Sequence, residues 1–407
     1  MKKYVFFLLL ILLLIPAFAL GQEAADLTAQ CEITATKGKY RTNIDRLRDR
    51  HFGKEYVSNK EKAPYVELKA PAGQPIYGLY VCFGGPMTPW KIEAKRGGGW
   101  ETVFQSDGRY VHEYAPLNGE KDVRVVPVAE KKVALTINEL YAFGEGEVPA
   151  FVQRWEPAPE KADLMVLSGH PDDEILFFGG AIPTYAGEKK MNVVVVYMTP
   201  CTMERRSELL NGLWEMGVRT YPVIGSFEDS YSNKLKAGYE RWKKTKVDQF
   251  LVGLLRQYKP EVVLTHDVNG EYGHGAHRVC ADAMQRCVIT AADAGQFADS
   301  ASAYGVWQVK KLYLHVFPEN SIEMDWDQPL TAFDGRTGYE VAADAYKLHV
   351  SQEGKGYKKN GKRVPFVVEP RDSAFSCYRF GLAYTAVGPD VQGNDFFENI
   401  PGYEGTD

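Results

Sequence analysis

The sequence predicts an α/β protein in two parts: an antiparallel β-sandwich, then a Rossmann-like domain with a parallel sheet. Short alternating apolar and polar runs, separated by turn residues, occupy 31–148 and are typical of antiparallel sheets. From 162 to 388, fully apolar runs alternate with helical patterns, which is typical of a parallel sheet covered on both faces. The chain has 407 residues, 45% hydrophobic and 25% charged, which is enough for two globular cores.

Residues 1–19 have the pattern of a secretory signal peptide. Two lysines precede an apolar run at 4–15, and Ala17-Phe18-Ala19 forms a small-x-small cleavage site. The run is shorter than the roughly 20 residues of a membrane span, so we expect cleavage rather than an uncleaved anchor. The mature protein is then expected to be secreted or otherwise extracytoplasmic, without a membrane span. The formal net charge of −5 disfavours a nucleic-acid partner, because phosphate binding needs a cationic surface.

Five alternating runs are the expected strands of the sandwich: Tyr65–Leu68, Ile76–Val81, Trp90–Ala94, Val123–Val128 and Val133–Ile137. Turns are expected at Gly97-Gly98-Gly99 and Asn118-Gly119. This part resembles the discoidin-type galactose-binding domains in the pattern of Trp90, Trp100 and a closing strand at 138–144. The resemblance implies glycan contact through the aromatic side chains. The alternative is that they fill the core, as Trp usually does in β-domains.

The second part alternates strands and helices in the order that a parallel sheet requires. The expected strands are Leu164–Leu167, Val193–Val196, Val223-Ile224, Val262–Leu264 and Leu312–Leu314, and the expected helices are Asp173–Ala186, Glu204–Met216, Tyr239–Tyr258 and His274–Ala292. Residues 149–161, with two prolines, are predicted to be a linker, and 389–407 an acidic tail. In such sheets ligands bind beyond the carboxyl ends of the strands.

Histidine and acidic side chains follow two of these strands at their carboxyl ends. His170-Pro171-Asp172-Asp173-Glu174 comes directly after the first strand of the second part, and Glu271 to His277 follows the fourth. Histidine and aspartate from two loops are the ligand pattern of an open catalytic zinc site, where the metal activates a water molecule. A second interpretation of Asp172 or Asp173 is that it caps the helix that starts there.

Both segments resemble hallmarks of the PIG-L/LmbE-like N-acetylglucosaminyl deacetylases. The first hallmark is His-Pro-Asp-Asp-Glu after a strand, at 170–174. The second is Gly-Tyr-Gly-His-x-x-His, which here reads Glu-Tyr-Gly-His-Gly-Ala-His at 271–277. The Arg-rich helix opening at Arg205-Arg206 also fits. The resemblance covers about 162–349.

The resemblance implies a complete set of groups for metal-dependent amide hydrolysis. His170, Asp173 and His277 are expected to hold Zn²⁺, or another divalent metal, because a His/His/Asp set suits several ions. Asp172 is expected to be the general base that takes a proton from water. Glu174 is expected to orient a ligand.

The same resemblance assigns the remaining site residues. His274 is expected to be the general acid for the leaving amine, or an electrostatic stabiliser. Tyr272 is expected to polarise the amide carbonyl or hold the oxyanion. Arg205 and Arg206 are expected to bind a substrate hydroxyl or phosphate, although a solvated helix opening explains them equally well.

One position departs from the family pattern. The family usually has His-Pro-Asp-His, whereas here Ala276 replaces the carboxylate that would tune His274. Glu271 or Asp267 could take its place through space. The acid role of His274 is therefore less secure than the metal role of His277.

These observations predict a secreted zinc-dependent deacetylase acting on the N-acetyl group of a sugar or glycoconjugate. One alternative is a carbohydrate-binding protein with weak or no catalysis, which only Ala276 favours. Another is a metal-dependent esterase or amidase that uses the same site. Of the other histidines, His266 is interpreted as a core or supporting histidine, and His349 as exposed on a helix, with reach into the pocket as the alternative.

Overall fold

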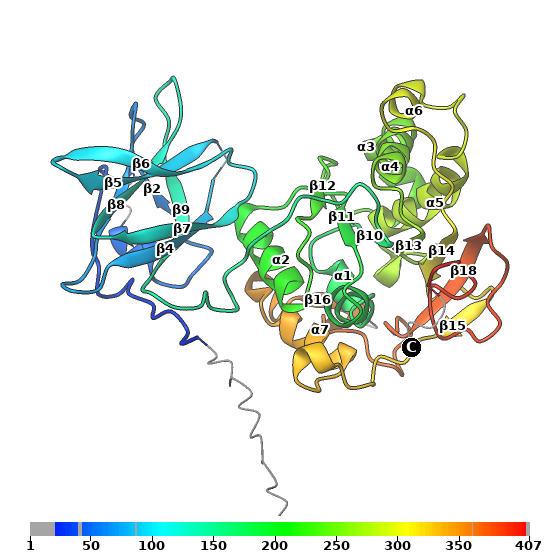
Figure 1. Cartoon of the computed structure of the whole chain (residues 1–407). Helices are drawn as coiled ribbons and strands as arrows, with labels where there is room; N and C mark the ends of the chain where they lie inside the picture. Colours follow the sequence, from blue (N-terminus) through cyan, green and yellow to red (C-terminus); the bar gives the residue numbers. More distant parts are fainter. Residues whose placement is uncertain (1–20, 40–42, 86–87, 360, 404–407) are drawn as a thin grey trace, which may run out of the picture.

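The computed structural model describes residues 21–39, 43–85, 88–359 and 361–403. It consists of a β-sandwich at the amino-terminal end and a larger α/β part (Figure 1). The predicted fold class is therefore confirmed. The expected signal peptide at 1–19 lies outside the described residues. Within the described ranges, no helix combines the length and the apolar character needed to cross a bilayer.

The sandwich packs a five-stranded sheet, in the order β1-β3-β8-β5-β6, against a four-stranded sheet, in the order β2-β9-β4-β7. The strands are β1 (Glu32–Ala35), β2 (Tyr56–Val57), β3 (Val66–Lys69), β4 (Ile76–Phe83), β5 (Trp90–Arg96), β6 (Gly99–Ser106), β7 (His112–Glu120), β8 (Asp122–Pro127) and β9 (Thr136–Phe143). Trp90 is 1% exposed and packs between Phe83 and Phe104. The Arg124 guanidinium lies 4.3 Å from the Trp100 ring centroid. Trp90 therefore fills the core, the second of its two predicted roles.

The expected turn at Asn118-Gly119 is wrong. Both residues lie inside β7, which pairs with β4 in one sheet, while the following strand β8 pairs with β5 in the other sheet. The chain thus crosses between the sheets here instead of making a hairpin. Strand β6 was missed because it is an edge strand with mostly exposed side chains, which leaves no clear alternation.

The second part is built on a seven-stranded sheet in the order β12-β11-β10-β13-β14-β18-β15. The strands are β10 (Leu164–Ser168), β11 (Val193–Tyr197), β12 (Val223–Ile224), β13 (Val262–Thr265), β14 (Lys311–His315), β15 (Ser321–Glu323) and β18 (Arg379–Thr385). The first five are parallel, as predicted, and β18 and β15 add an antiparallel edge. A separate hairpin joins β16 (Gly356–Lys359) to β17 (Lys362–Pro365).

Helices cover both faces of this sheet. One face carries α1 (Asp173–Leu176), the π-helical turn Pro183–Glu188, α2 (Met203–Glu215) and α7 (Gly338–Tyr346), and the other carries α3 (Leu235–Trp242), α4 (Lys244–Tyr258) and α5 (Gly275–Thr290), with α6 (Ala298–Tyr304) beyond. Two expected helices are interrupted. The helix expected after β10 ends at Leu176, and the π-helical turn begins only at Pro183. Between them, Gly180 packs so closely against Trp326 that a Cβ atom would not fit. The helix expected at Tyr239–Tyr258 is divided at Lys243, whose φ of 61° is not helical.

Segment 149–161 packs against both parts. Val152, Gln153 and Trp155 are buried. The Nδ1 atom of His112, on β7, lies 2.8 Å from Oε1 of Gln153, and its Nε2 atom lies 3.1 Å from Oγ of Ser207 on α2. The sandwich, this segment and α2 thus share one buried polar contact. At the carboxyl end, the described part of the acidic segment docks on the fold through the buried side chains of Phe396 and Ile400.

Candidate active site

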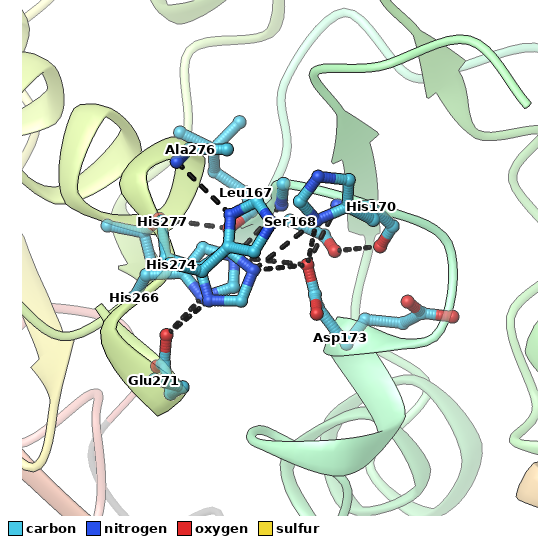
Figure 2. Close-up of polar contacts among 12 residues, drawn as sticks. Leu167, Ser168, His170, Asp173, His266, Glu271, His274, Ala276 and His277 are labelled. Carbon is cyan, nitrogen blue, oxygen red and sulfur yellow. Dashed lines mark hydrogen bonds and ion pairs between the residues drawn. The ribbon is translucent and has the colours of Figure 1, made fainter. Parts of the chain in front are cut away.

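The two histidine-bearing loops meet because their strands are neighbours. β10 and β13 pair in parallel, with Val166 opposite Leu264, so their carboxyl ends open at the same edge of the sheet. Figure 2 shows the imidazoles from both loops turned toward Asp173. Two segments about a hundred residues apart in sequence thereby form one cluster.

Three of these side chains have the spacing of metal ligands. The Oδ2 atom of Asp173 lies 3.1 Å from Nδ1 of His170 and 3.1 Å from Nε2 of His277, and these two nitrogens are 3.3 Å apart. Ligands about 2.0–2.2 Å from a tetrahedral zinc ion are roughly 3.3 Å from one another, so the triangle matches. Burial alone would raise the pKa of Asp173, but His277 and His170 hold it well below its usual range. The residues present therefore fit a divalent cation.

Two other histidines are close enough to be considered as ligands. His274 groups with His170 and His277, and His266 groups with Asp173 and His277. Both ring nitrogens of His266 are engaged, however. Its Nε2 atom accepts a hydrogen bond from the Gly169 amide at 2.9 Å, and its Nδ1 atom lies 2.8 Å from Glu271. His266 therefore supports the site as a buried histidine.

Glu271 is a buried carboxylate shared by three histidines. Its Oε2 atom lies 2.8 Å from Nδ1 of both His266 and His277, and its Oε1 atom lies 2.6 Å from Nδ1 of His315. Burial alone would raise the pKa of Glu271, but these histidines hold it well below its usual range. Asp173 and Glu271 raise the pKa of His277 to about 10 against the lowering effect of burial. Glu271 thus orients His277 with Nε2 toward Asp173 and His170, and it does not contact His274.

Asp172 is buried and held in a strained backbone conformation. Its φ is 113°, and its carboxylate makes no capping hydrogen bond to α1, which argues against the capping interpretation. Burial raises the pKa of Asp172 to about 7, an effect that Arg205 opposes. The Arg205 Nη2 atom lies 3.0 Å from Asp172 Oδ1. The amide of Asp172 donates to Glu174 at 2.9 Å, so Glu174 contacts Asp172 rather than His170, Asp173 or His277.

His274 stands at the amino end of α5 with one nitrogen engaged. Its Nδ1 atom accepts a hydrogen bond from the Ala276 amide at 3.2 Å, so in the neutral ring the proton is on Nε2. Burial and the neighbouring His277 and His170 lower the pKa of His274 to about 3. A neutral ring with Nε2–H can donate a hydrogen bond without being an imidazolium.

Tyr272 lines the same pocket at an unusual backbone position, with a φ of 54°. Its ring stacks on Tyr357 with centroids 4.0 Å apart, and its hydroxyl donates to the buried carboxylate of Glu369. Burial and Glu369 raise the pKa of Tyr272. The hydroxyl must therefore leave Glu369 before it can contact a carbonyl oxygen.

The pocket over the cluster has a volume of about 210 Å³. Arg205 lines it, whereas Arg206 lies beside the Cys201 thiol and does not. Sequence reasoning missed four lining residues, which come from separate segments: Leu176, Asp229, Gln352 and Phe366. Asp229 Oδ1 lies 3.6 Å from Nε2 of His170. Leu176 closely follows the His170–Glu174 segment, whereas nothing in the local sequence around Asp229, Gln352 or Phe366 indicates a site.

The expectation that His349 is exposed is wrong. The side chain is fully buried, and neither ring nitrogen has a hydrogen-bond partner among the described residues. It packs against Gly212 of α2, where a Cβ atom would lie 3.1 Å from Nε2. Burial and the nearby Arg205 lower its pKa to about 3.

A parallel sheet with a His/Asp/His cluster at its carboxyl edge defines the class of metal-dependent hydrolases. Residues 165–288 match the model of the PIG-L family, described as GlcNAc-PI de-N-acetylase. Residues 165–288 are therefore a PIG-L domain, as the His-Pro-Asp-Asp-Glu segment predicts.

Two curated relatives carry the same printed name, 1D-myo-inositol 2-acetamido-2-deoxy-alpha-D-glucopyranoside deacetylase 1. The protein from Catenulispora acidiphila is 24% identical over 282 residues, covering 60% of this chain and 85% of the relative. The protein from Frankia casuarinae is 27% identical over 194 residues, covering 40% of this chain and 62% of the relative. The chain thus spans under two thirds of the second relative's length.

Two solved structures are each similar to a portion of the chain. A conserved protein from Thermus thermophilus covers 47% of this chain and 80% of its own, at 18% identity and a TM-score of 0.35. The family 32 carbohydrate-binding module of C. perfringens NanJ, solved with galactose, covers 30% of this chain and 98% of its own, at 9% identity and a TM-score of 0.26.

Proposed function

We propose that this protein is a metal-dependent deacetylase that hydrolyses the N-acetyl group of an N-acetylated amino sugar, with Zn²⁺ as its metal. The observation that carries the proposal is the triangle of His170, Asp173 and His277, with a buried carboxylate, Asp172, adjacent in sequence. The relatives' printed names support an acetamido sugar as the substrate. The signal-peptide pattern at 1–19 supports action outside the cytoplasm.

His170, Asp173 and His277 would hold a divalent ion, which would supply Lewis-acid chemistry for the acetamide and for the water. Asp172 takes the proton from the attacking water. A carboxyl group with a pKa near 7 suits this task, since it can both accept and release a proton near neutral pH. Arg205 keeps the Asp172 carboxylate in place through its 3.0 Å contact.

His274 serves as a hydrogen-bond donor to the developing oxyanion. Its Nδ1 atom accepts from the Ala276 amide, which leaves Nε2–H for the substrate. Because its pKa is lowered to about 3, electrostatic stabilisation suits it better than a permanent imidazolium. The proton for the leaving amine then comes from Asp172, which received it from water.

The test is acetate release from N-acetylglucosamine, with O-acetylated glucose as the competing substrate. The zinc-loaded protein is expected to release acetate from the N-acetyl sugar, and Asp172→Asn, as the matched control, is expected to retain zinc and release almost none. Faster release from the O-acetyl sugar would indicate an esterase. Release from neither substrate, with zinc bound, would favour the non-catalytic alternative.

A further inference from the structure

A second hollow, with a volume of about 230 Å³, lies between the sandwich and α2. Figure 1 shows α2 at the junction of the two parts. The sandwich side of the hollow, with the segment that follows it, contributes aromatic rings such as Tyr141 and Phe151. The α2 side contributes Asn211, Trp214 and Glu215. None of these side chains belongs to the site described above.

The aromatic rings that line the hollow contact one another, but part of their surface remains exposed. The ring centroids of Tyr141 and Phe151 are 5.2 Å apart, and the Arg50 guanidinium lies 3.6 Å from the Tyr141 centroid. Phe151 remains 49% exposed, although buried apolar side chains lie beside it. An open aromatic ring in a concave site is typical of a ligand-binding surface.

Polar groups with spare hydrogen-bonding capacity face the same hollow. Asn211 uses Oδ1 to accept from Gln153 at 2.7 Å, and among the described residues its Nδ2 group donates to no protein acceptor. Glu215 uses Oε1 in a 3.1 Å ion pair with Arg336, which leaves Oε2 as an acceptor. Aromatic faces beside one donor and one acceptor suit a pyranose ring, which has apolar C–H faces and a rim of hydroxyls.

The hollow shares two elements with the active-site pocket. On α2, Arg205 lines the pocket and Asn211 lines the hollow, about 9 Å further along the helix axis. On the segment after α7, Leu348 lines the hollow and Gln352 lines the pocket. Val350, between these two, is 64% exposed, so that stretch of the surface is open. The two volumes, about 210 and 230 Å³, are nearly equal.

We propose that this hollow is an accessory subsite that binds another sugar of the same glycan chain whose N-acetyl group occupies the active site. The inference rests on the proposed function and narrows it, because the preferred substrate is then an oligosaccharide or polysaccharide. The sandwich contributes to glycan binding here, at the junction, and Trp90 does not take part.

The test compares N-acetylglucosamine with its β-1,4-linked hexamer as substrates. Phe151→Ala is expected to raise KM for the hexamer roughly 2- to 10-fold, the usual effect of one aromatic contact, and to leave KM for the monomer unchanged. Asn211→Asp keeps the acceptor for Gln153 but removes the donor, and should act in the same direction. Tyr304→Ala is the matched control, because Tyr304 is 42% exposed on α6 and lines neither hollow.

Unchanged hexamer KM in both folded variants would overturn the subsite, while monomer turnover would still support the deacetylase. If the protein hydrolyses neither sugar, the proposed function fails, and calorimetric titration with the hexamer decides the subsite alone. The subsite is supported if Phe151→Ala weakens hexamer binding and Tyr304→Ala leaves it unchanged. Equal binding by all variants, or no binding by the wild type, overturns it.

Discussion

Glu271→Gln is expected to weaken metal binding, although it replaces none of the three proposed metal ligands. The carboxylate accepts from four groups, the Nδ1 atoms of His266, His277 and His315 and the amide of Asp267, two at each oxygen. An amide has one acceptor oxygen, so two of the four contacts are lost in either orientation. Hydrogen bonds to charged groups contribute about 1.5–3 kcal/mol each, so the folded state should lose roughly 3–6 kcal/mol. Losing the partner of a metal-binding histidine typically lowers metal affinity about 10- to 100-fold.

The assay is zinc affinity by chelator competition, with urea unfolding of the same protein. Glu174→Gln is the matched control, because Glu174 is equally buried but among the described residues it contacts no histidine, and its hydrogen bond from the Asp172 amide can also be accepted by an amide oxygen. Its zinc affinity should stay close to wild type. Wild-type affinity in a folded Glu271→Gln protein, or an equal loss in Glu174→Gln, would refute the orienting role of Glu271.

Asp172→Asn should retain zinc and lower kcat about 100- to 10,000-fold, whereas Asp173→Asn should lower the zinc content itself; equal zinc loss in both would mean that their roles are misassigned. Burial lowers the pKa of His112 from 6.5 to about 4, so the unfolded state binds the proton more readily and stability falls as pH drops below about 6.5. Between pH 7 and 5 the protonation of His112 in the unfolded state lowers the free energy of unfolding by about 2 kcal/mol. His112→Gln should show a smaller decrease over the same pH range, measured by urea unfolding. A chain shortened to begin at Pro157 lacks the buried Trp155 and should melt at a lower temperature than the full chain; equal melting temperatures would show that the junction adds no stability.

That His170, Asp173 and His277 lie together could be predicted because these residues follow strands whose type is evident from sequence alone. Apolar runs such as Val262–Leu264 identify parallel strands, and adjacent carboxyl ends bring His170 and His277 together. The partners of these side chains were not predictable. His315 ends β14, and only the folded sheet places it against Glu271.

Other details depend on side-chain direction. Arg205 and Arg206 lie about 100° apart around α2, so only one can face the pocket, and the sequence does not say which. Glycan contact through Trp90 was one of its two predicted roles, but Trp90 is buried, whereas Phe151, in the segment after the sandwich, is 49% exposed. Whether an aromatic residue on a strand is buried depends on how the two sheets pack, and Trp90 lies in the core between them.

The strained backbone at Asp172 means that a residue proposed to act in catalysis also lowers the stability of the fold. A φ of 113° is strained for any L-residue and natural for glycine, and such strain typically costs about 1–3 kcal/mol. Burial of the carboxyl group adds to this cost at pH values above its pKa of about 7. Asp172→Gly would relieve both and would cost the 3.0 Å contact with Arg205, so wherever the relief is the larger effect, a screen of random variants for heat resistance alone delivers robust but inactive protein. Engineering this enzyme for durability therefore requires selection for turnover in every round.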